Sequence, residues 1–508
     1  MDRESAAVCR VVESAAGDAG GGKRSGSVRI VQMTTRLALL LIAAQLCAQD
    51  RGAILMEFQG FLSIPNVASD GPNIRRNAEW LKQAMERRGI KSQLLEAAGA
   101  PPVVYGELTA PGAKRTVVLY AHYDGQPADA RQWKGSPPWE PSMRGGSPMD
   151  PETRLYARSS ADDKAPIMAM LAALDGMKQF NLKPSVNLKF VFEGEEEAGS
   201  AHLGQILAAN RRLVSGDYWL ICDGPVHQTR RQQIYFGARG VVGLNLTVHG
   251  AARELHSGHY GNWSPNPAVM LAHLIASMRD ENGQVLIDGF YDGIEPLSET
   301  EKRALAAAPD IDAMLMKELG LARTEGRGVL EVINRPSLNI RGVRSAGVGE
   351  ESRNVVPSEA TVSIDIRLVK GNDPARMIEL LKKHVAGRGF VVLDREPAPE
   401  ERLKHARIAT MKVSDAGYRA VRTSMDLAES REVIAAVKRL RPDVVLLPTL
   451  GGSVPLAIIE DVVKAPMIGV PTVNHDNNQH AANENLRLKD FWNGIELFQA
   501  LFMMETAK

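Results

Sequence analysis

The sequence alternates short β-rich runs with helical stretches from about residue 52 onward, and this alternation constrains the fold more than any other feature. The β-rich runs are residues 116–122, 186–193 and 218–223, and helical stretches such as 166–177 separate them. Strands that alternate with helices in this way form a sheet whose faces the helices cover. The sequence therefore predicts an α/β fold with a mixed sheet covered by helices.

An amphipathic helix is predicted ahead of these strands. Ile74, Ala78, Leu81 and Met85 recur at helical spacing, so they share one face that can pack against a sheet. Gly89 follows where a helix commonly ends in a left-handed residue. We therefore expect the helix to end just before Gly89.

The order of predicted strands and helices changes after residue 239. Five segments follow one another in the order strand, helix, strand, helix and strand: 242–248, 267–278, 362–368, 374–385 and 390–393. Both longer strands alternate apolar and polar residues, as strands with one buried face do. This order predicts an inserted α+β domain of the ferredoxin-like type with an antiparallel sheet.

The length of the chain is consistent with such an insertion. At roughly 150 residues per domain, a chain of 508 residues corresponds to about three domain-equivalents, or to one large domain with a smaller one inserted. We expect an N-terminal extension with a signal peptide, a first part of the α/β domain, the inserted domain and a second part of the α/β domain. Their predicted bounds are 1–49, 52–238, 239–402 and 403–508.

Charge and cysteine content exclude several classes of function. The 61 basic and 60 acidic residues give a net charge of +1, so no overall charge favours a nucleic-acid partner or a membrane surface. The three cysteines are too few and too scattered for a disulfide framework or a cysteine-based zinc site. If the protein binds a metal, histidines and carboxylates must hold it.

The N-terminal region is typical of a targeting segment. Arg36 precedes a short apolar run, 37–46, which is too brief to span a bilayer but suits the core of a signal peptide. Cleavage near Ala48 would leave a mature chain with no transmembrane span, so we expect a periplasmic or extracellular protein. Cys47 leaves lipoprotein anchoring open, and a buried N-terminal helix is a further alternative.

Polar residues follow the ends of the predicted strands. His122, Glu196, Glu197 and Asp223 lie at or just after the ends of the three β-rich runs. Singly, each has an ordinary structural explanation, such as a surface turn, a helix cap or a solvated acidic face. Ligands of open α/β sheets, however, bind beyond the carboxyl ends of strands. The negative charges of so many carboxylates in one crevice repel one another unless a cation neutralises them. Because imidazole and carboxylate ligands suit zinc, we expect a site for zinc or a similar divalent metal.

The sequence resembles the M20 family of di-zinc metallopeptidases, particularly its dipeptidase, or carnosinase-like, branch. The matching motifs occur in the family's order from about residue 55 to the C-terminus. They are His122-x-Asp124, Tyr156-Ala-Arg-Ser-Ser-Ala-Asp162-Asp163-Lys164, Phe192-Glu-Gly-Glu-Glu196-Glu197-Ala-Gly-Ser200, Ile221-Cys-Asp223, Leu255-His256-Ser-Gly258, Gly451-Gly-Ser453 and His480-Ala-Ala-Asn-Glu484.

The resemblance implies two divalent metal ions per subunit, expected to be Zn²⁺, with Mn²⁺ and Co²⁺ as alternatives. His122 and Asp223 would hold one ion, Glu197 and His480 the other, and Asp162 would bridge both. A bridge needs a carboxylate, because its two oxygens can serve two cations. His475 is the alternative to His480, although the following Asn483-Glu484 favours His480.

The resemblance also implies catalytic residues beyond the metal ligands. Asp124 would orient His122 through its second ring nitrogen, and Glu196 would act as the general base. The inserted domain would form a homodimer and cover the active site. His256 would then stabilise the oxyanion in the partner's cleft.

Further positions match residues that bind a substrate's C-terminal carboxylate in the family. They are Asn354, Arg367, Gly452 and Ser453. For Arg367, a salt bridge on a strand face is an equally good interpretation. A glycine-rich loop such as 451–453 offers backbone N–H groups to an anion.

The function implied by the resemblance is metal-dependent hydrolysis of amide bonds in dipeptides or short peptides with a free C-terminal carboxylate. An N-acyl amino acid amidohydrolase would share the fold and the bond chemistry, so this alternative stays open. A non-catalytic homologue is less consistent with the sequence, since every expected ligand and Glu196 are present.

Overall fold

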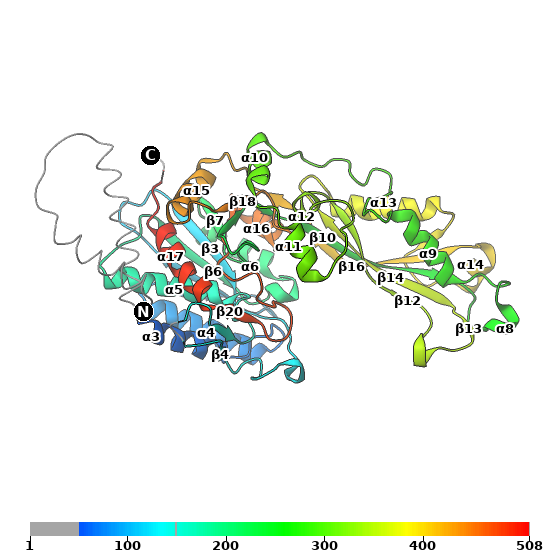
Figure 1. Cartoon of the computed structure of the whole chain (residues 1–508), viewed down its shortest axis with the longest axis horizontal. Coiled ribbons are helices and arrows are strands. Elements are labelled where there is room, and N and C mark those ends of the chain that lie inside the picture. The colour runs from blue at the N-terminus through cyan, green and yellow to red at the C-terminus, as the bar shows by residue number, and fades with distance from the viewer. Residues whose placement is uncertain (1–49, 148–149, 507–508) are drawn as a thin grey trace, which may run out of the picture.

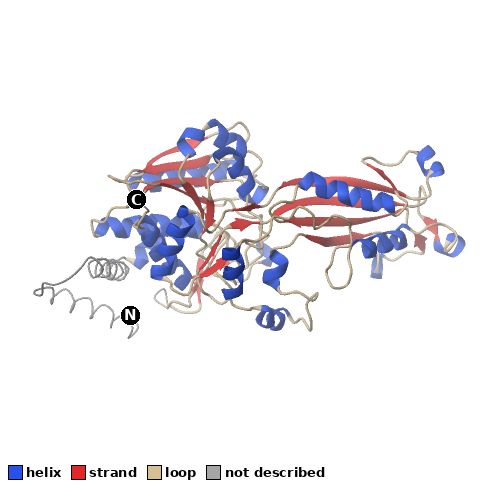
Figure 2. Cartoon of the chain, turned by 90° about the horizontal axis from the view of Figure 1, so that it is seen from above, coloured by secondary structure: helices blue, strands red, loops and turns tan. Residues whose placement is uncertain are grey.

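The computed structural model describes residues 50–147 and 150–506 as a larger and a smaller lobe along one long axis (Figure 1). In Figure 2, helices lie on both sides of the larger lobe's strands, and the smaller lobe extends from it as a sheet with its own helices. The predicted signal segment and Cys47 lie outside the described residues, so export stays a prediction. Among the described helices, none combines the length and the apolar character needed to cross a membrane.

The larger lobe is built on a mixed eight-stranded sheet. Its strands, in spatial order, are β1 (Lys91–Leu95), β2 (Val103–Leu108), β6 (Asn187–Glu193), β3 (Thr116–His122), β7 (Tyr218–Ile221), β19 (Met467–Gly469), β8 (Gln233–Tyr235) and β18 (Val445–Leu447). The central strands β6, β3, β7 and β19 run parallel, whereas β1 and β2 are antiparallel additions at one edge. The carboxyl ends of the central strands therefore lie at one edge of the sheet.

Helices cover both faces of this sheet. Along β3, Val117 and Leu119 belong to the apolar cluster on one face, while Val118 and Tyr120 belong to the cluster on the other. Successive side chains of a strand point to opposite faces, so a strand buried on both faces is apolar throughout. The helices of this lobe are α3 (Arg51–Leu62), α4 (Gly71–Arg87), α5 (Lys164–Gln179), α6 (Leu203–Ala209), α7 (Arg211–Val214), α15 (Ala428–Leu440), α16 (Leu456–Val463) and α17 (Leu488–Phe502).

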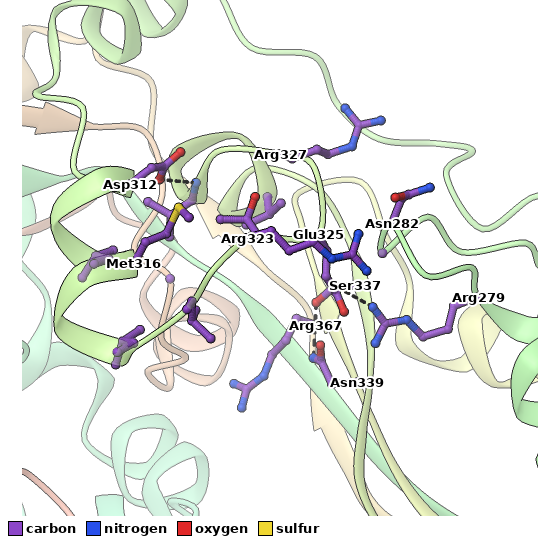
Figure 3. Close-up of a pocket in the computed structure, with 18 of the residues that line it drawn as sticks. Arg279, Asn282, Asp312, Met316, Arg323, Glu325, Arg327, Ser337, Asn339 and Arg367 are labelled. Carbon is purple, nitrogen blue, oxygen red and sulfur yellow. Dashed lines mark hydrogen bonds and ion pairs between the residues drawn. The ribbon is translucent and has the colours of Figure 1, made fainter.

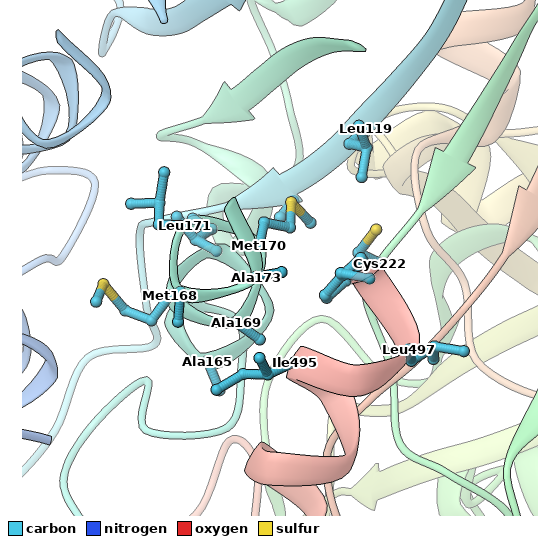
Figure 4. Close-up of a cluster of buried hydrophobic side chains, with 14 of the residues drawn as sticks. Leu119, Ala165, Met168, Ala169, Met170, Leu171, Ala173, Cys222, Ile495 and Leu497 are labelled. Carbon is cyan, nitrogen blue, oxygen red and sulfur yellow. The ribbon is translucent and has the colours of Figure 1, made fainter. Parts of the chain in front are cut away.

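The helix α5 is buried between the sheet and α17 (Figure 4). Its alanines, such as Ala165 and Ala169, allow close approach, while Met168 and Met170 fill the spaces around them. A helix that is apolar on most of its surface is stable only in such an interior position. The helix α4 instead buries one face through Ile74, Ala78, Leu81 and Met85, as the sequence predicts, and Asp70 caps its first turn.

The smaller lobe is built on a five-stranded sheet. Its strands, in spatial order, are β12 (Ser337–Arg344), β14 (Glu359–Leu368), β10 (Gly240–His249), β16 (Ile408–Tyr418) and β15 (Val391–Leu393). The helices α9 (Pro267–Met278) and α13 (Pro374–Gly387) share an apolar cluster with this sheet, and α9 packs against β10 and β14 whereas α13 packs against β15 and β16. All pairings are antiparallel except β15 with β16.

The remaining elements are short. They are β4 (Ser142–Arg144), β5 (Arg154–Tyr156), β9 (Gly237–Ala238), β11 (Leu255–His256), β13 (Val355–Val356), β17 (Val421–Arg422), β20 (Asn485–Arg487), α8 (Ser257–Tyr260), α10 (Glu299–Ala307), α11 (Asp312–Leu319), α12 (Val329–Ile333), α14 (Pro399–Lys404) and three 3₁₀ turns, Ala130–Gln132, Glu196–Ala198 and Gly349–Glu351. The pair β9 and β17 joins the two ends of the segment that forms the smaller lobe.

The structure places the return to the larger lobe later than residue 402. The strand β16 pairs with β10 and belongs to the five-stranded sheet. The sequence did not predict this strand, because polar residues such as Lys412 and Ser414 are exposed and interrupt its apolar residues. The helix α10, although it lies within the predicted insertion, packs against β18 of the larger lobe.

Candidate metal centre

Four of the predicted site residues lie at the carboxyl ends of neighbouring parallel strands. His122 is the last residue of β3, Glu196 and Glu197 form the turn after β6, and Asp223 follows β7. Because β6, β3 and β7 pair in parallel, their carboxyl ends meet at one edge of the sheet. Residues far apart in the sequence thus converge on one crevice.

Asp162 lies between two groups of metal-ligand side chains. One group combines it with His122 and Asp223, and the other with Glu197 and His480, with the ligand atoms of each group within 4.8 Å of one another. Its Oδ1 lies 3.1 Å from Nε2 of His122, and its Oδ2 lies 3.1 Å from Nε2 of His480. Each carboxylate oxygen therefore serves a different group, which is the arrangement of a carboxylate that bridges two cations.

The donor chemistry of these groups fits two divalent cations. Each group offers one imidazole nitrogen and carboxylate oxygens, which are ligands that zinc and related ions accept. His480, and not His475, lies 3.2 Å from Glu197 and completes the second group. All five residues predicted as metal ligands are thus brought together.

The carboxylates of the two ligand groups are buried, so their negative charges need a nearby positive charge. Burial, together with Asp162 and Glu197, raises the pKa of Asp223 to about 7, while His122 and His480 oppose this shift. At Asp162, burial also disfavours the charge, but hydrogen bonds with His122 and His480 hold its pKa below the usual range. Bound cations would supply the same compensation without protons.

Asp124 connects His122 with the turn after β6. Its Oδ1 lies 3.3 Å from Nδ1 of His122, and its two oxygens accept the backbone N–H groups of Glu196 and Glu197 at 3.1 and 3.0 Å. The carboxylate is fully buried. The same side chain therefore orients one metal-ligand candidate and positions the turn that carries another.

Glu196 faces the cavity in front of the metal groups. Its side chain lines a cavity of about 630 Å³ together with Asp162, Asp223 and His480. Burial raises its pKa well above the usual value, and Asp223 and Glu197 raise it further while His122 opposes them. A carboxylate with a raised pKa is suited to accept a proton and release it again near neutral pH.

Glu484 holds the loop that carries Asp162, a role that the sequence did not reveal. This buried carboxylate accepts backbone N–H groups of Ser159, Ala161 and Asp162 at 2.8 to 3.0 Å and pairs with Arg158 at 2.8 Å. Its only signal in the sequence is its place in the motif after His480. The peptide bond between Asp162 and Asp163 is cis.

Two glutamines also contact the ligand groups and were not predicted. Gln479 Nε2 donates to Asp162 Oδ2 at 3.2 Å, and Gln126 Nε2 donates to Glu197 Oε2 at 2.9 Å. Their amide groups can fix the orientation of these carboxylates. In the sequence, only their nearness to predicted site residues pointed to them: Gln479 precedes His480, and Gln126 follows shortly after Asp124.

Arg367 and the glycine-rich loop line the same cavity as the metal-ligand groups. Arg367, Gly452 and Ser453 line it, and Arg367 Nη1 donates to Ser453 Oγ at 2.8 Å. Arg367 also pairs with Asp365 on its own strand. The arginine therefore forms a salt bridge on the strand face and also lines the cavity, as the two interpretations of the sequence expected. These residues offer a positive charge and hydroxyl and backbone donors to the cavity that Glu196 also lines.

A second cavity, of about 760 Å³, adjoins the first (Figure 3). Arg367 and the glycine-rich loop line both cavities, while Arg239, Arg279 and Arg323 line only the second. Burial, with a contribution from Arg367, lowers the pKa of Arg239 to about 10. Glu281, Asp312 and Glu325 also line the second cavity, and Arg279 pairs with Glu325, so charges of both signs lie beside Arg367 there.

His256 and Asn354 lie apart from this site within one chain. His256 ends β11 and Asn354 directly precedes β13, the strand that pairs with β11 beside α8, and the Ser257 N–H donates to the Asn354 carbonyl at 2.9 Å. This pair lies at the end of the smaller lobe farthest from β3 and β7 (Figure 1). The structure therefore does not bring Asn354 to Arg367 within a single subunit, and it leaves His256 exposed.

Comparisons with known proteins find similar chains over most of this sequence. A Cys-Gly metallodipeptidase of Schizosaccharomyces pombe is 26% identical over 86% of this chain and 92% of its own length. The human Beta-Ala-His dipeptidase is 27% identical over 79% of this chain and 77% of its own. The model of the family described as "Peptidase family M20/M25/M40" matches residues 118–504.

Solved structures share the fold. The M20 family metallo-carboxypeptidase of Sulfolobus solfataricus aligns with a TM-score of 0.74 at 27% identity, covering 88% of this chain and 98% of that chain. Human carnosine dipeptidase 1 aligns with a TM-score of 0.72 at 21% identity, covering 92% and 98%. These matches confirm the predicted fold class and the predicted resemblance. The chain belongs to peptidase family M20/M25/M40 and is a metal-dependent peptidase.

Proposed function

We propose that this peptidase hydrolyses dipeptides or short peptides that end in a free carboxylate, with two divalent cations and a Glu196 general base. The observation that carries the proposal is the position of Asp162, whose two oxygens face two ligand groups beside Glu196. When bound, the two cations lower the pKa of a water molecule and polarise the scissile carbonyl. His122 and Asp223 would hold one cation, and Glu197 and His480 the other.

The protein's own residues would then move the proton. Glu196 accepts a proton from the attacking water and delivers it to the leaving amine, so the carboxylate is regenerated in each turnover. Asp124 keeps Nδ1 of His122 engaged, which leaves Nε2 directed at the cation site. Asp124 also accepts the backbone N–H groups of Glu196 and Glu197. The orientation of His122 and the position of the base Glu196 therefore both depend on Asp124.

Arg367 and the loop 451–453 would bind the substrate's C-terminal carboxylate. They line the same cavity of about 630 Å³ as the metal groups, a volume within the range of small-molecule sites. A guanidinium can pair with a carboxylate through two hydrogen bonds and so fix the register of the scissile bond. The dipeptidase relatives favour a dipeptide substrate over an N-acyl amino acid.

A homodimer would complete the site. His256 lies on an exposed tip with Tyr260 and Trp263, and Trp263 is 78% exposed, an uncommon position for tryptophan on a free surface. In the proposed dimer this tip docks on the partner. His256 then stabilises the oxyanion in the partner's cleft, and Asn354 approaches the same cleft.

The test is a substrate panel on the mature protein with a defined metal content. We expect dipeptides with a free carboxylate to be cleaved faster than their C-terminal amides and faster than N-acetyl or N-succinyl amino acids. Chelation should abolish activity and Zn²⁺ should restore it, with Mn²⁺ and Co²⁺ as comparisons. Preferred cleavage of N-acyl amino acids would identify an amidohydrolase instead. Export, the remaining proposal, is tested by N-terminal sequencing of the mature protein.

A further inference from the structure

A third group of metal-ligand side chains lies in the smaller lobe, apart from the candidate metal centre. His249 is the last residue of β10, and it pairs directly with Glu359, the first residue of β14. Glu396 reaches the same place from the segment before α14. The ligand atoms of His249, Glu359 and Glu396 all lie within 4.8 Å of one another.

The hydrogen bonds of His249 fix which ring nitrogen carries the proton. Thr410 Oγ1 donates to the Arg395 carbonyl at 3.1 Å, so its hydroxyl proton is already engaged. The same oxygen lies 2.7 Å from His249 Nε2 and must therefore accept the N–H of that nitrogen. This leaves Nδ1 with a lone pair. An oriented, neutral imidazole of this kind is the form that binds a metal.

Nδ1 of His249 is buried and has no hydrogen-bond partner. The His249 side chain is 1% exposed, and Nδ1 lies 3.8 Å from Oε2 of Glu396, too far for a hydrogen bond. Two ligands of one tetrahedral zinc ion, at bond lengths near 2.0–2.2 Å, lie about 3.4 Å apart. The separation observed is therefore close to that of two ligands around a common cation, and such a cation would give the orphaned nitrogen a partner.

The charges around the group are consistent with a divalent ion. Burial lowers the pKa of His249, Arg402 adds to this shift, and Glu396 and Glu359 oppose it. Glu359 and Glu396 supply two negative charges at an exposed edge. Arg402 is occupied in part by the Gly250 carbonyl, to which its Nη1 donates at 3.0 Å.

We propose that His249, Glu359 and Glu396 form a structural site for one divalent cation of the zinc class. The cation would join β10, β14 and the segment before α14. Just beyond it, Gly250 N–H donates to the Ser358 carbonyl at 2.7 Å, and the chain continues into β11 and β13. The site therefore lies at the base of the arm that carries His256 and Asn354, and it would restrain that arm.

The test counts zinc ions in the full-length protein. The variant Glu359→Gln/Glu396→Gln removes both surface carboxylates without disturbing the core, and Glu379→Gln, on the exposed face of α13, is the matched control. After equilibration with Zn²⁺ and removal of free ions, wild type and control should hold one more equivalent per chain than the double variant. Equal stoichiometry in all three proteins would overturn the proposal.

A second variant tests the geometry of the imidazole. Thr410→Val keeps the volume but removes the acceptor of the Nε2 proton, so the affinity for the additional Zn²⁺ should fall about 10–100-fold. Calorimetric titration of enzyme that already holds its catalytic ions measures this affinity. An unchanged affinity in Thr410→Val would contradict the assignment of Nδ1 as the ligand atom. The readout does not depend on turnover, so it remains valid if the proposed catalytic function is wrong.

Discussion

The buried carboxylate of Asp124 accepts the backbone N–H of Glu197 at 3.0 Å, and so links the strand that ends in His122 to the turn that carries the second ligand group. The second oxygen accepts the N–H of Glu196. A charged acceptor forms stronger hydrogen bonds than a neutral one, and more so in a buried site. The position of Glu196 and the orientation of His122 therefore depend on one side chain.

Asp124→Asn should reduce both metal affinity and turnover. The amide keeps the shape but offers one acceptor oxygen in place of two charged ones, so the turn after β6 loosens. We expect a loss of about 10–100-fold in metal affinity or activity, as for other residues that orient metal ligands. Zinc titration and kcat measure the effect, and Asp129→Asn, on the surface turn at 130–132, is the control. Unchanged values would show that Asp124 is not required for positioning.

Glu196→Gln should retain both metal ions and lose turnover. General acid–base catalysis contributes typically about 10²–10⁴-fold, and glutamine cannot take part in it. Glu195→Gln is the matched control, because Glu195 pairs with His202 at 2.9 Å and does not line the cavity in front of the metal groups. Metal analysis and kcat at saturating substrate separate the two functions. Full activity in Glu196→Gln would refute the assignment of the base.

Binding of zinc to the metal-free protein should release a proton from His480. Hydrogen bonds with Asp162 and Glu197 raise the pKa of this half-exposed imidazole from 6.5 to about 10. Its stabilising contribution to the metal-free fold is therefore fully present below pH 6.5 and is lost as the pH rises through about 10. A cation must displace that proton, so zinc affinity should rise with pH below this value.

Calorimetry in buffers of different ionisation enthalpy measures the proton release. In His480→Gln the number of protons released per zinc should fall. If it equals the wild-type number, the proton comes from another group.

Arg367→Gln should weaken the binding of substrates with a free carboxylate. Hydrogen bonds to charged groups contribute about 1.5–3 kcal/mol, which corresponds to roughly a 10–100-fold loss in kcat/KM. A dipeptide amide lacks the carboxylate, so its kcat/KM should change little. The ratio of the two substrates is the measurement, and Arg344→Gln, at the exposed end of β12, is the control. An equal loss for both substrates would indicate a structural role.

Mixing two inactive variants should restore activity if His256 acts in the partner's cleft. In a heterodimer of Glu196→Gln with His256→Ala, one of the two clefts combines an intact Glu196 with an intact His256 from its partner. Random exchange of subunits then gives about a quarter of the wild-type activity, because half of the dimers carry one complete site. Sedimentation or light scattering verifies the dimer. A mixture no more active than the sum of its components would contradict catalysis across the interface.

Several elements were predictable because their signals are local. The apolar face of α4 and the continuous apolar run of β3 follow from the period of the helix and of the buried strand. The strand β16 was missed because one face is exposed and its pairing with β10 lies far away in the sequence. Glu484 was seen only as part of a motif, since its partners are backbone N–H groups of a distant loop.

The sequence by itself determined that imidazole and carboxylate groups follow the ends of neighbouring strands, because side-chain chemistry and the strand pattern are local properties. Only the tertiary structure decided which groups meet. It placed the two oxygens of Asp162 between His122 and His480, and it placed His256 and Asn354 together at the far end of the smaller lobe. Such pairings depend on strand order and packing between residues separated by long stretches of chain, which no local pattern encodes.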